Sequence, residues 1–444
     1  MWAIVLFLFQ IFSVSGCNDP SPSQSAVMVE RLQEIARTTD PLNNTYLSDR
    51  RVAVYKAESE PEDPVSQISF RIRLAKELLQ SGYNDEAIRL FEESNIRAPK
   101  YGIKTRPTLK EYLALSYLRL GEQQNCVENH NSESCLFPIN GGGVHFIGDG
   151  ARNAVSLYKT LFKDAPDNLS LRWLLNIACM VSGQYPEGVP EEALIPQHLF
   201  SNSHKIPRFK DRAASLGVDV MGLAGGVAVD DFNNDGLLDI VTTSWALDGP
   251  IHYFRNAGNA GFIEESELAG LLGIVGGLNL RHVDYNNDGN IDLFVLRGGW
   301  FGEQGRHPNS LLKNLGGGRF VDVTEQAGLL SLHPTQTACW ADFNNDGRMD
   351  FIIAHRFYYT TSSLSLLTGD IGILLSESVS NGQVVYTSET RLAATTESQG
   401  TPPADILIQD LDQDSKLDLL LSLPINQKLA VLSGKNYTGS LNCP

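Results

Sequence analysis

Residues 231–239 read Asp-Phe-Asn-Asn-Asp-Gly-Leu-Leu-Asp, and three later segments repeat this nine-residue pattern. The later segments are DYNNDGNID from Asp284, DFNNDGRMD from Asp342 and DLDQDSKLD from Asp410. The segment starts are therefore separated by 53, 58 and 68 residues. Such a spacing is typical of a four-stranded propeller blade and is longer than most helical repeats.

Apolar and β-branched residues flank the loops, as in GGVAV before the first loop and DIVTTSW after it. In the first repeat we expect strands near 225–230, 239–245, 251–255 and 261–264. A Phe followed by acidic residues recurs at Phe209, Phe262 and Phe320. Each repeat therefore predicts the order strand, loop, strand, strand, strand.

The fourth repeat predicts strands near 405–409, 417–423 and 428–432, with no confident outer strand after them. The segment 206–211 carries the outer-strand Phe motif but precedes the first repeat. We therefore expect residues 206–211 to pair with 428–432 if the propeller closes on itself.

The loops place oxygen-bearing side chains at positions 1, 3, 5 and 9, and the backbone carbonyl of position 7 is available as a further ligand. Oxygen ligands in a tight loop with Gly at position 6 suit Ca²⁺. The fourth loop departs most from the pattern, because Ser415 stands where the others have Gly. The predicted ligands are Asp231, Asn233, Asp235, Leu237 and Asp239; Asp284, Asn286, Asp288, Asn290 and Asp292; Asp342, Asn344, Asp346, Arg348 and Asp350; and Asp410, Asp412, Asp414, Lys416 and Asp418.

Two other interpretations of these loops fit the sequence less well. An EF-hand needs a bidentate Glu at position 12, where this chain has Thr242, Val295, Ile353 and Leu421. Ordinary Asn/Asp/Gly turns would explain one such loop more readily than four in register. Calcium-binding loops between strands remain the favoured interpretation.

On these motifs, and on matches such as LLKNLGGGRFVDVTEQAGL, residues 201–444 resemble FG-GAP/VCBS repeats, the propeller repeats of integrin α-chains. Within that group they are most similar to bacterial relatives of cartilage acidic protein. The resemblance implies a β-propeller with calcium in the loop between the first two strands of each blade. Members often carry N-terminal tetratricopeptide repeats and an ASPIC/UnbV domain.

Helical patterns dominate the preceding region. Residues 67–99 predict a hairpin with a turn at Ser81-Gly82, and LAKELLQSGYNDEAIRLFEESNIRAP resembles a tetratricopeptide repeat. A second repeat begins near Tyr112, and residues 122–150 interrupt its two helices as an insertion. A generic array of helical hairpins is the alternative. The fold class is therefore multidomain, with all-α tetratricopeptide-like hairpins followed by an all-β propeller of about four visible blades.

The N-terminal run MWAIVLFLF is too short to span a bilayer but has the length of a signal-peptide core. Val14-Ser15-Gly16-Cys17 resembles a bacterial lipobox, which implies lipidation of Cys17; an ordinary signal peptide is the alternative. Both interpretations predict an extracytoplasmic protein, at the cell envelope or cell surface.

Cys126 and Cys135 lie in a polar, Asn-rich stretch, so we expect a disulfide between them in an oxidising compartment. A zinc site that adds His130 and His145 is the alternative, although no C-x₂-C spacing is present.

The expected domains are a lipoprotein-type signal peptide at 1–17, a polar tether with a short helix at 18–66, the helical domain at 67–200 and the calcium-binding propeller at 201–444. A net charge of −17 disfavours nucleic acid as a partner. No nucleophile or open metal site is convincing, although His252, His282, His307, His333 and His355 leave a polysaccharide- or ester-cleaving enzyme as the alternative. We expect a non-enzymatic scaffold that binds protein or glycan and is tied to a membrane by lipid.

Overall fold

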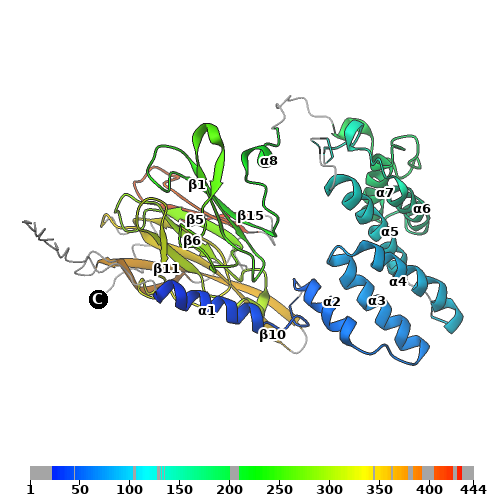
Figure 1. Cartoon of the computed structure of the whole chain (residues 1–444), viewed down its shortest axis with the longest axis horizontal. Coiled ribbons are helices and arrows are strands. Elements are labelled where there is room, and N and C mark those ends of the chain that lie inside the picture. The colour runs from blue at the N-terminus through cyan, green and yellow to red at the C-terminus, as the bar shows by residue number, and fades with distance from the viewer. Residues whose placement is uncertain are drawn as a thin grey trace, which may run out of the picture. The chain divides into compact units, whose positions relative to one another are not determined.

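The computed structural model forms two compact units, one of residues 40–212 and one of residues 1–39 with 213–444 (Figure 1). It describes residues 23–44, 46–103, 107–127, 131, 133–134, 136–200, 210–343, 346–361, 364–378, 384–392, 405–423 and 428–432. Within these residues, no helix combines the length and the apolar character needed to cross a bilayer.

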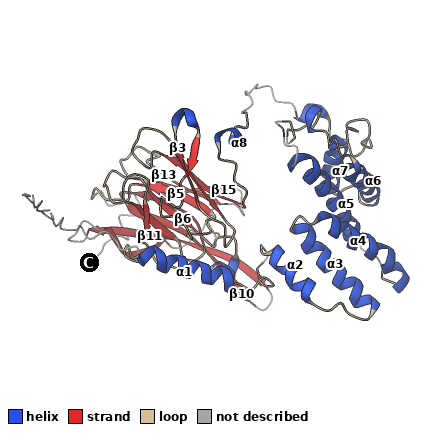
Figure 2. Ribbon diagram, in the orientation of Figure 1, coloured by secondary structure: helices blue, strands red, loops and turns tan. Residues whose placement is uncertain are grey.

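The first unit is helical and stacks consecutive helices (Figure 2). Asp63 caps α3 through its side chain, and Gly82 takes a φ of 80° in the turn before α4, as the predicted hairpin requires. Ala75, Leu78 and Phe91 are buried between the helices. The helices of this unit are α2 (Ser48–Ala57), α3 (Pro64–Gln80), α4 (Asn84–Arg97), α5 (Pro107–Glu122), α6 (Asp149–Asp164) and α7 (Leu169–Val181).

Helices α5 and α6 pack against each other, although about 26 residues separate them along the chain. After α5 the chain continues into a short π-helix, Gln123–Val127. The predicted insertion at 122–150 thus lies between the two members of a helix pair, and the pair itself keeps its packing.

Helix α1 (Ser23–Thr38) belongs to the second unit. Met28, Leu32 and Ala36 recur every four residues, so they form one apolar stripe, and Met28 and Leu32 enter a core cluster of the sheets. The Ser25 hydroxyl accepts the N–H of Asp322 at 2.9 Å. We expected a polar tether with one short helix at 18–66; the structure has α1 and α2 there, because α1 has an apolar face to bury.

The described residues of the second unit form four antiparallel sheets whose strands follow one another in chain order. The predicted order of strand, loop, strand, strand, strand is confirmed in the first three sheets, and the fourth has three strands among the described residues. The sheets are β1 (Ala224–Asp230), β2 (Asp239–Ser244), β3 (His252–Asn256) and β4 (Phe262–Glu264); β5 (Asn279–Val283), β6 (Asp292–Leu296), β7 (Ser310–Asn314) and β8 (Phe320–Asp322); β9 (Thr335–Ala341), β10 (Asp350–Thr361), β11 (Leu364–Ser378) and β12 (Val384–Leu392); and β13 (Asp405–Gln409), β14 (Asp418–Leu423) and β15 (Lys428–Leu432).

Neighbouring sheets contact each other through their first strands, β1 with β5, β5 with β9 and β9 with β13. Strand β6 is buried along its whole length, because the first and third sheets cover its two faces. Phe294 on β6 packs against Phe351 on β10, with ring centroids 4.8 Å apart. First strands side by side and sheets stacked face to face are the arrangement of propeller blades.

The predicted closure between residues 206–211 and 428–432 stays a prediction, because 206–209 lie outside the described residues. Strand β15 pairs with β14 on one side.

Candidate metal centre

Each Asp-rich loop joins the first and second strands of its sheet. The strand register is the same in all four sheets: the last residue of the first strand is paired with the ninth loop residue, as in Asp230 with Asp239 and Gln409 with Asp418. Because the first strands lie side by side, this shared register brings the loops to the same edge of their sheets. The repeated sequence motif therefore forms a row of similar loops at this edge.

The first loop is held in shape by its first carboxylate. Asp231 Oδ1 accepts the N–H of Asp235 at 3.0 Å, and Asp231 Oδ2 accepts the N–H of Gly236 at 2.7 Å. Asn233 Oδ1 accepts the same Asp235 N–H at 2.9 Å. The side chains of positions 1, 3 and 5 are therefore gathered on the inside of one tight turn.

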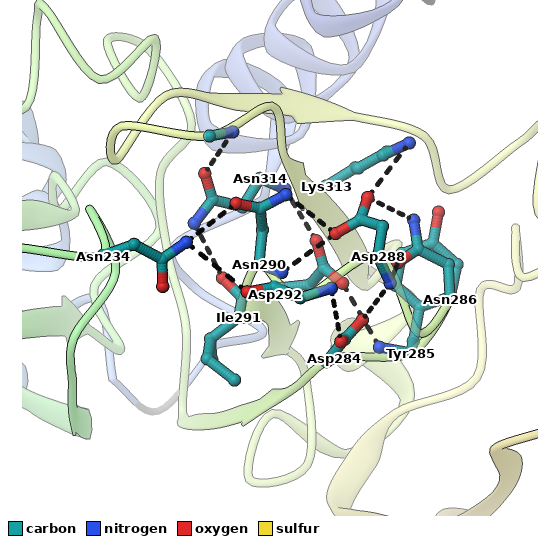
Figure 3. Close-up of polar contacts among 12 residues, drawn as sticks. Asn234, Asp284, Tyr285, Asn286, Asp288, Asn290, Ile291, Asp292, Lys313 and Asn314 are labelled. Atoms are coloured by element: carbon teal, nitrogen blue, oxygen red, sulfur yellow. Dashed lines mark hydrogen bonds and ion pairs between the residues drawn. The ribbon is translucent and has the colours of Figure 1, made fainter.

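The other loops repeat this geometry. Asp284 accepts the N–H groups of Asp288 at 3.0 Å and of Gly289 at 2.8 Å (Figure 3). Asp342 accepts those of Asp346 and Gly347 at 3.0 and 2.8 Å. Asn286 also lies inside its loop, where its amide donates to Asp288 Oδ2 at 2.9 Å. The predicted ligand Asn344 lies outside the described residues.

The fourth loop keeps the same backbone in spite of Ser415. Ser415 has a φ of 67°, close to the 82° of Gly347, and its N–H donates to Asp410 Oδ2 at 2.9 Å. Ser415 thus takes the backbone conformation that Gly has in the other loops, and whether this loop binds an ion stays a prediction. Among the described residues, the one group of three acidic or imidazole side chains whose ligand atoms all lie within 4.8 Å of one another is Asp410, Asp412 and Asp418.

The ninth-position carboxylates are buried beneath the loops. Burial, together with the charges of Asp288 and Asp284, raises the pKa of Asp292 to about 8. Asp292 Oδ1 accepts the N–H of Asn314, on β7, at 2.7 Å. Asp239 and Asp350 accept backbone N–H groups from the third strands of their own sheets in the same way, and burial raises their pKa values too. Closely spaced buried carboxylates without a cation resist ionisation.

Position 7 was predicted to offer its carbonyl. In all four loops the N–H of this residue donates to the position-5 carboxylate at 2.9–3.0 Å. Two cations also reach position 5: Lys313 Nζ lies 3.5 Å from Asp288 Oδ2, and the Arg348 guanidinium pairs with Asp346. In the second and third loops a basic side chain therefore already offsets part of the negative charge.

Two asparagine roles were not predicted. Asn234 Nδ2 donates to Asn290 Oδ1 at 3.0 Å, which links the first loop to the second. Buried Asn314 donates through Nδ2 to the carbonyls of Phe232 and Ile291 at 2.7 and 3.0 Å. The available signals were Asn at position 4 of three loops and the recurrence of Asn-x-Gly after the third strand, at Asn256 and Asn314.

The other predicted sites are only partly described. Cys126 Sγ lies 3.6 Å from His145 Nε2, but Cys135 and His130 lie outside the described residues, as does Cys17. The Cys126–Cys135 disulfide, its zinc alternative and lipidation of Cys17 therefore stay predictions.

Comparison with known proteins places repeats where the loops lie. The FG-GAP-like repeat family matches residues 231–295 and 284–353, which include the first three loops. Cartilage acidic protein 1 of Mus musculus is 27% identical over 227 residues, which cover 50% of this chain and 32% of the relative. The Xenopus tropicalis protein of that name is 27% identical over 230 residues, with the same two coverages. The Homo sapiens protein is also 27% identical over 227 residues, 50% of this chain and 31% of the relative.

The chain therefore contains FG-GAP-like repeats and is distantly similar to cartilage acidic protein 1 over half its length. It spans about a third of the length of the curated relatives that it matches.

Proposed function

We propose that the four Asp-rich loops bind Ca²⁺ and that the protein is an extracytoplasmic, non-enzymatic scaffold that binds a protein or glycan at the cell envelope. The observation that carries the calcium proposal is the repetition of one loop geometry at one edge of four sheets, in which the first carboxylate accepts the N–H of the fifth residue in every loop. Anchorage through lipidated Cys17 would place the scaffold on a membrane.

The residues present fit a hard cation. Their side-chain donors are carboxylate and amide oxygens, the ligands that Ca²⁺ prefers, and no thiol or imidazole contributes. A cation would also favour the ionised form of Asp292, whose pKa is raised by burial and by the charges of Asp288 and Asp284. Asp410, Asp412 and Asp418 already lie close enough to share one ion. When bound, the ion would cross-link the ends of two strands; the chain's own residues supply the loop shape.

The binding role is supported by the architecture. Repeated sheets and stacked helix pairs each present an extended surface on which loops vary without disturbing the core. The net charge of −17 favours a cationic or neutral partner over nucleic acid.

Isothermal titration of metal-depleted, full-length protein with CaCl₂ tests the calcium proposal. We expect saturable binding in the range of about 0.1–1 mM typical of extracellular sites. The double variant Asp410→Asn/Asp412→Asn should bind about one ion fewer per chain. Glu267→Gln, an exposed acidic residue outside the loops, is the matched control and should bind as many ions as wild type. Absence of saturable binding up to about 10 mM would overturn the proposal.

The scaffold proposal has its own test. Glycan arrays and cross-linking to purified envelope proteins, each with and without chelator, should show a partner that is retained in calcium and lost in chelator. Turnover of a glycan or ester by the purified protein would instead support an enzyme. Cys17→Ser should move the protein from the detergent phase to the aqueous phase, and unchanged partitioning would contradict the lipid anchor.

A further inference from the structure

A small pocket lies in the second unit, away from the Asp-rich loops. It is lined by residues before β5, such as Gly276, by Arg297 and His307 after β6, by Trp245 and by Leu32 of α1. The loop at 284–291 joins the opposite ends of β5 and β6, which run antiparallel. This Arg297 pocket is therefore at the other edge of the sheet from the candidate metal centre.

Arg297 is buried, with 3% of its surface exposed. Its Nε–H donates to the Val275 carbonyl at 2.8 Å, and Nη1 donates to the Pro308 carbonyl and the Ser310 hydroxyl, both at 2.9 Å. A guanidinium has five N–H groups, and these contacts use three of them. The remaining two are on Nη2, which has no hydrogen-bond partner.

The positive charge of Arg297 also lacks an ion-pair partner. Among the described residues, no carboxylate forms a direct ion pair with its guanidinium. The buried Asp322 acts on it less directly, because Ser310 hydrogen-bonds Asp322 and also accepts from Arg297 Nη1. Burial lowers the pKa of Arg297 to about 10 and raises the pKa of Asp322. A buried cation whose counter-charge is only indirect is costly.

His307 also lines this pocket and carries a second unsatisfied nitrogen. The residue is 4% exposed and its Nε2 has no partner. Its ring packs 5.3 Å from that of Phe301, which in turn lies 5.9 Å from Trp245. Aromatic walls around two unpaired nitrogens make a site with low polarity in which a charged contact is strong.

The loop that positions both residues is tightly closed. Gly298 has a φ of 82°, and a Cβ there would lie 1.9 Å from the Gly305 carbonyl oxygen. Only glycine allows the two ends of the loop to approach so closely. The loop therefore holds Arg297 and His307 on a backbone with little freedom to move.

We propose that the Arg297 pocket binds a small anion through the two free N–H groups of Arg297 Nη2 and through His307 Nε2. The anion supplies a direct counter-charge to the guanidinium, and its approach favours the protonated imidazole, which donates from Nε2. A carboxylate oxygen and a halide share this chemistry, and the pocket volume of about 10 Å³ leaves room for about one water-sized atom. The site does not depend on the candidate metal centre.

Nuclear magnetic resonance with two probes tests the proposal on the full chain saturated with calcium. [1-¹³C]acetate is titrated in chloride-free buffer, and ³⁵Cl line width is measured in acetate-free buffer. We expect saturable broadening of one or both signals by the wild type. Arg297→Gln and His307→Gln should each weaken binding by about tenfold or more, because each removes a charge-assisted hydrogen bond. Arg319→Gln, an exposed arginine in the β7–β8 turn, should leave it unchanged.

Acetate broadening identifies a carboxylate site, and chloride broadening alone identifies a halide site; both support the proposal if the variants weaken them. Broadening by neither probe, or broadening that survives both substitutions, overturns it. If Arg297→Gln does not fold, His307→Gln and the Arg319→Gln control decide the question. Calcium titration of His307→Gln should match wild type, so this result is separable from that of the metal centre.

Discussion

Asn234 in the first Asp-rich loop donates from Nδ2 to Asn290 Oδ1 in the second, at 3.0 Å (Figure 3). The next pair repeats the relationship, because Asn287 Nδ2 donates to the Gly347 carbonyl at 3.0 Å. Three successive loops are thus tied by the amide at position 4. Because the loops are linked in this way, we expect a change in the shape of one to affect the next.

Asn234→Gly tests this link. Asn234 has a φ of 59°, which glycine adopts freely, so the substitution removes the amide without straining the backbone. Glycine also removes the cost of a side chain at this φ, so the matched control is Gln413→Gly, at the same loop position with a φ of 61°. We expect the change in the free energy of unfolding to be about 1 kcal/mol less favourable for Asn234→Gly than for Gln413→Gly, the usual net value of a hydrogen bond. Chemical denaturation gives the measurement, and equal changes in both variants would contradict the linking role.

The sequence predicted most of the sheet unit, because the same pattern of strands and loops repeats along the chain. Position 9 of each loop opens a strand in the structure, as Asp239 opens β2 and Asp418 opens β14. The link from Asn234 to Asn290 joins residues in different repeats. Its geometry depends on the distance between neighbouring sheets, which no local pattern contains. Side-chain partners between blades are therefore the part that sequence does not predict.

Helix α1 also combines a local feature that the sequence predicts with a distant contact that it does not predict. The spacing of Met28, Leu32 and Ala36 in the sequence indicates an apolar stripe, but it does not indicate which residues the stripe packs against. The Asp322 N–H that meets Ser25 lies about 300 residues away along the chain. The Arg297 pocket includes Leu32 and Ile35 of this helix, so sequence motifs do not predict the pocket either.

Removal of calcium should destabilise the sheet unit. Each described loop gathers several carboxylates whose repulsion opposes folding, and an ion present at about ten times its Kd stabilises by about 1.4 kcal/mol per site. We expect the melting temperature, followed by near-ultraviolet circular dichroism, to fall when EGTA replaces CaCl₂. Glu267→Gln should show the same fall as wild type. A melting temperature that is indifferent to EGTA would contradict a stabilising role for the ion.

Acid should destabilise the protein through His307. Burial and the charge of Arg297 lower the pKa of His307 from 6.5 to about 4 in the folded state. The unfolded chain therefore binds this proton first, so the stabilising contribution is complete above pH 6.5 and is lost as pH falls toward 4. We expect a loss of up to about 3 kcal/mol over this window in anion-free buffer. Urea denaturation at several pH values measures it. His307→Gln should flatten the dependence, and an unchanged slope in that variant would assign the acid effect to other groups.

Ser415→Gly should stabilise the fourth loop. Ser415 has a φ of 67° and is exposed, and its N–H donates to Asp410 Oδ2 as Gly236 donates to Asp231 Oδ2. A side chain in this left-handed region costs about 1 kcal/mol, and glycine avoids that cost without changing the hydrogen bond. We therefore expect unfolding in urea to require about 0.5–1 kcal/mol more, with calcium affinity unchanged or higher. Gly236→Ser is the reciprocal variant: no atom lies within 4 Å of a Cβ at Gly236, so the substitution adds only backbone strain. It should lose a similar amount, and a gain there, or a loss in Ser415→Gly, would show that the backbone at position 6 is not what limits the loop.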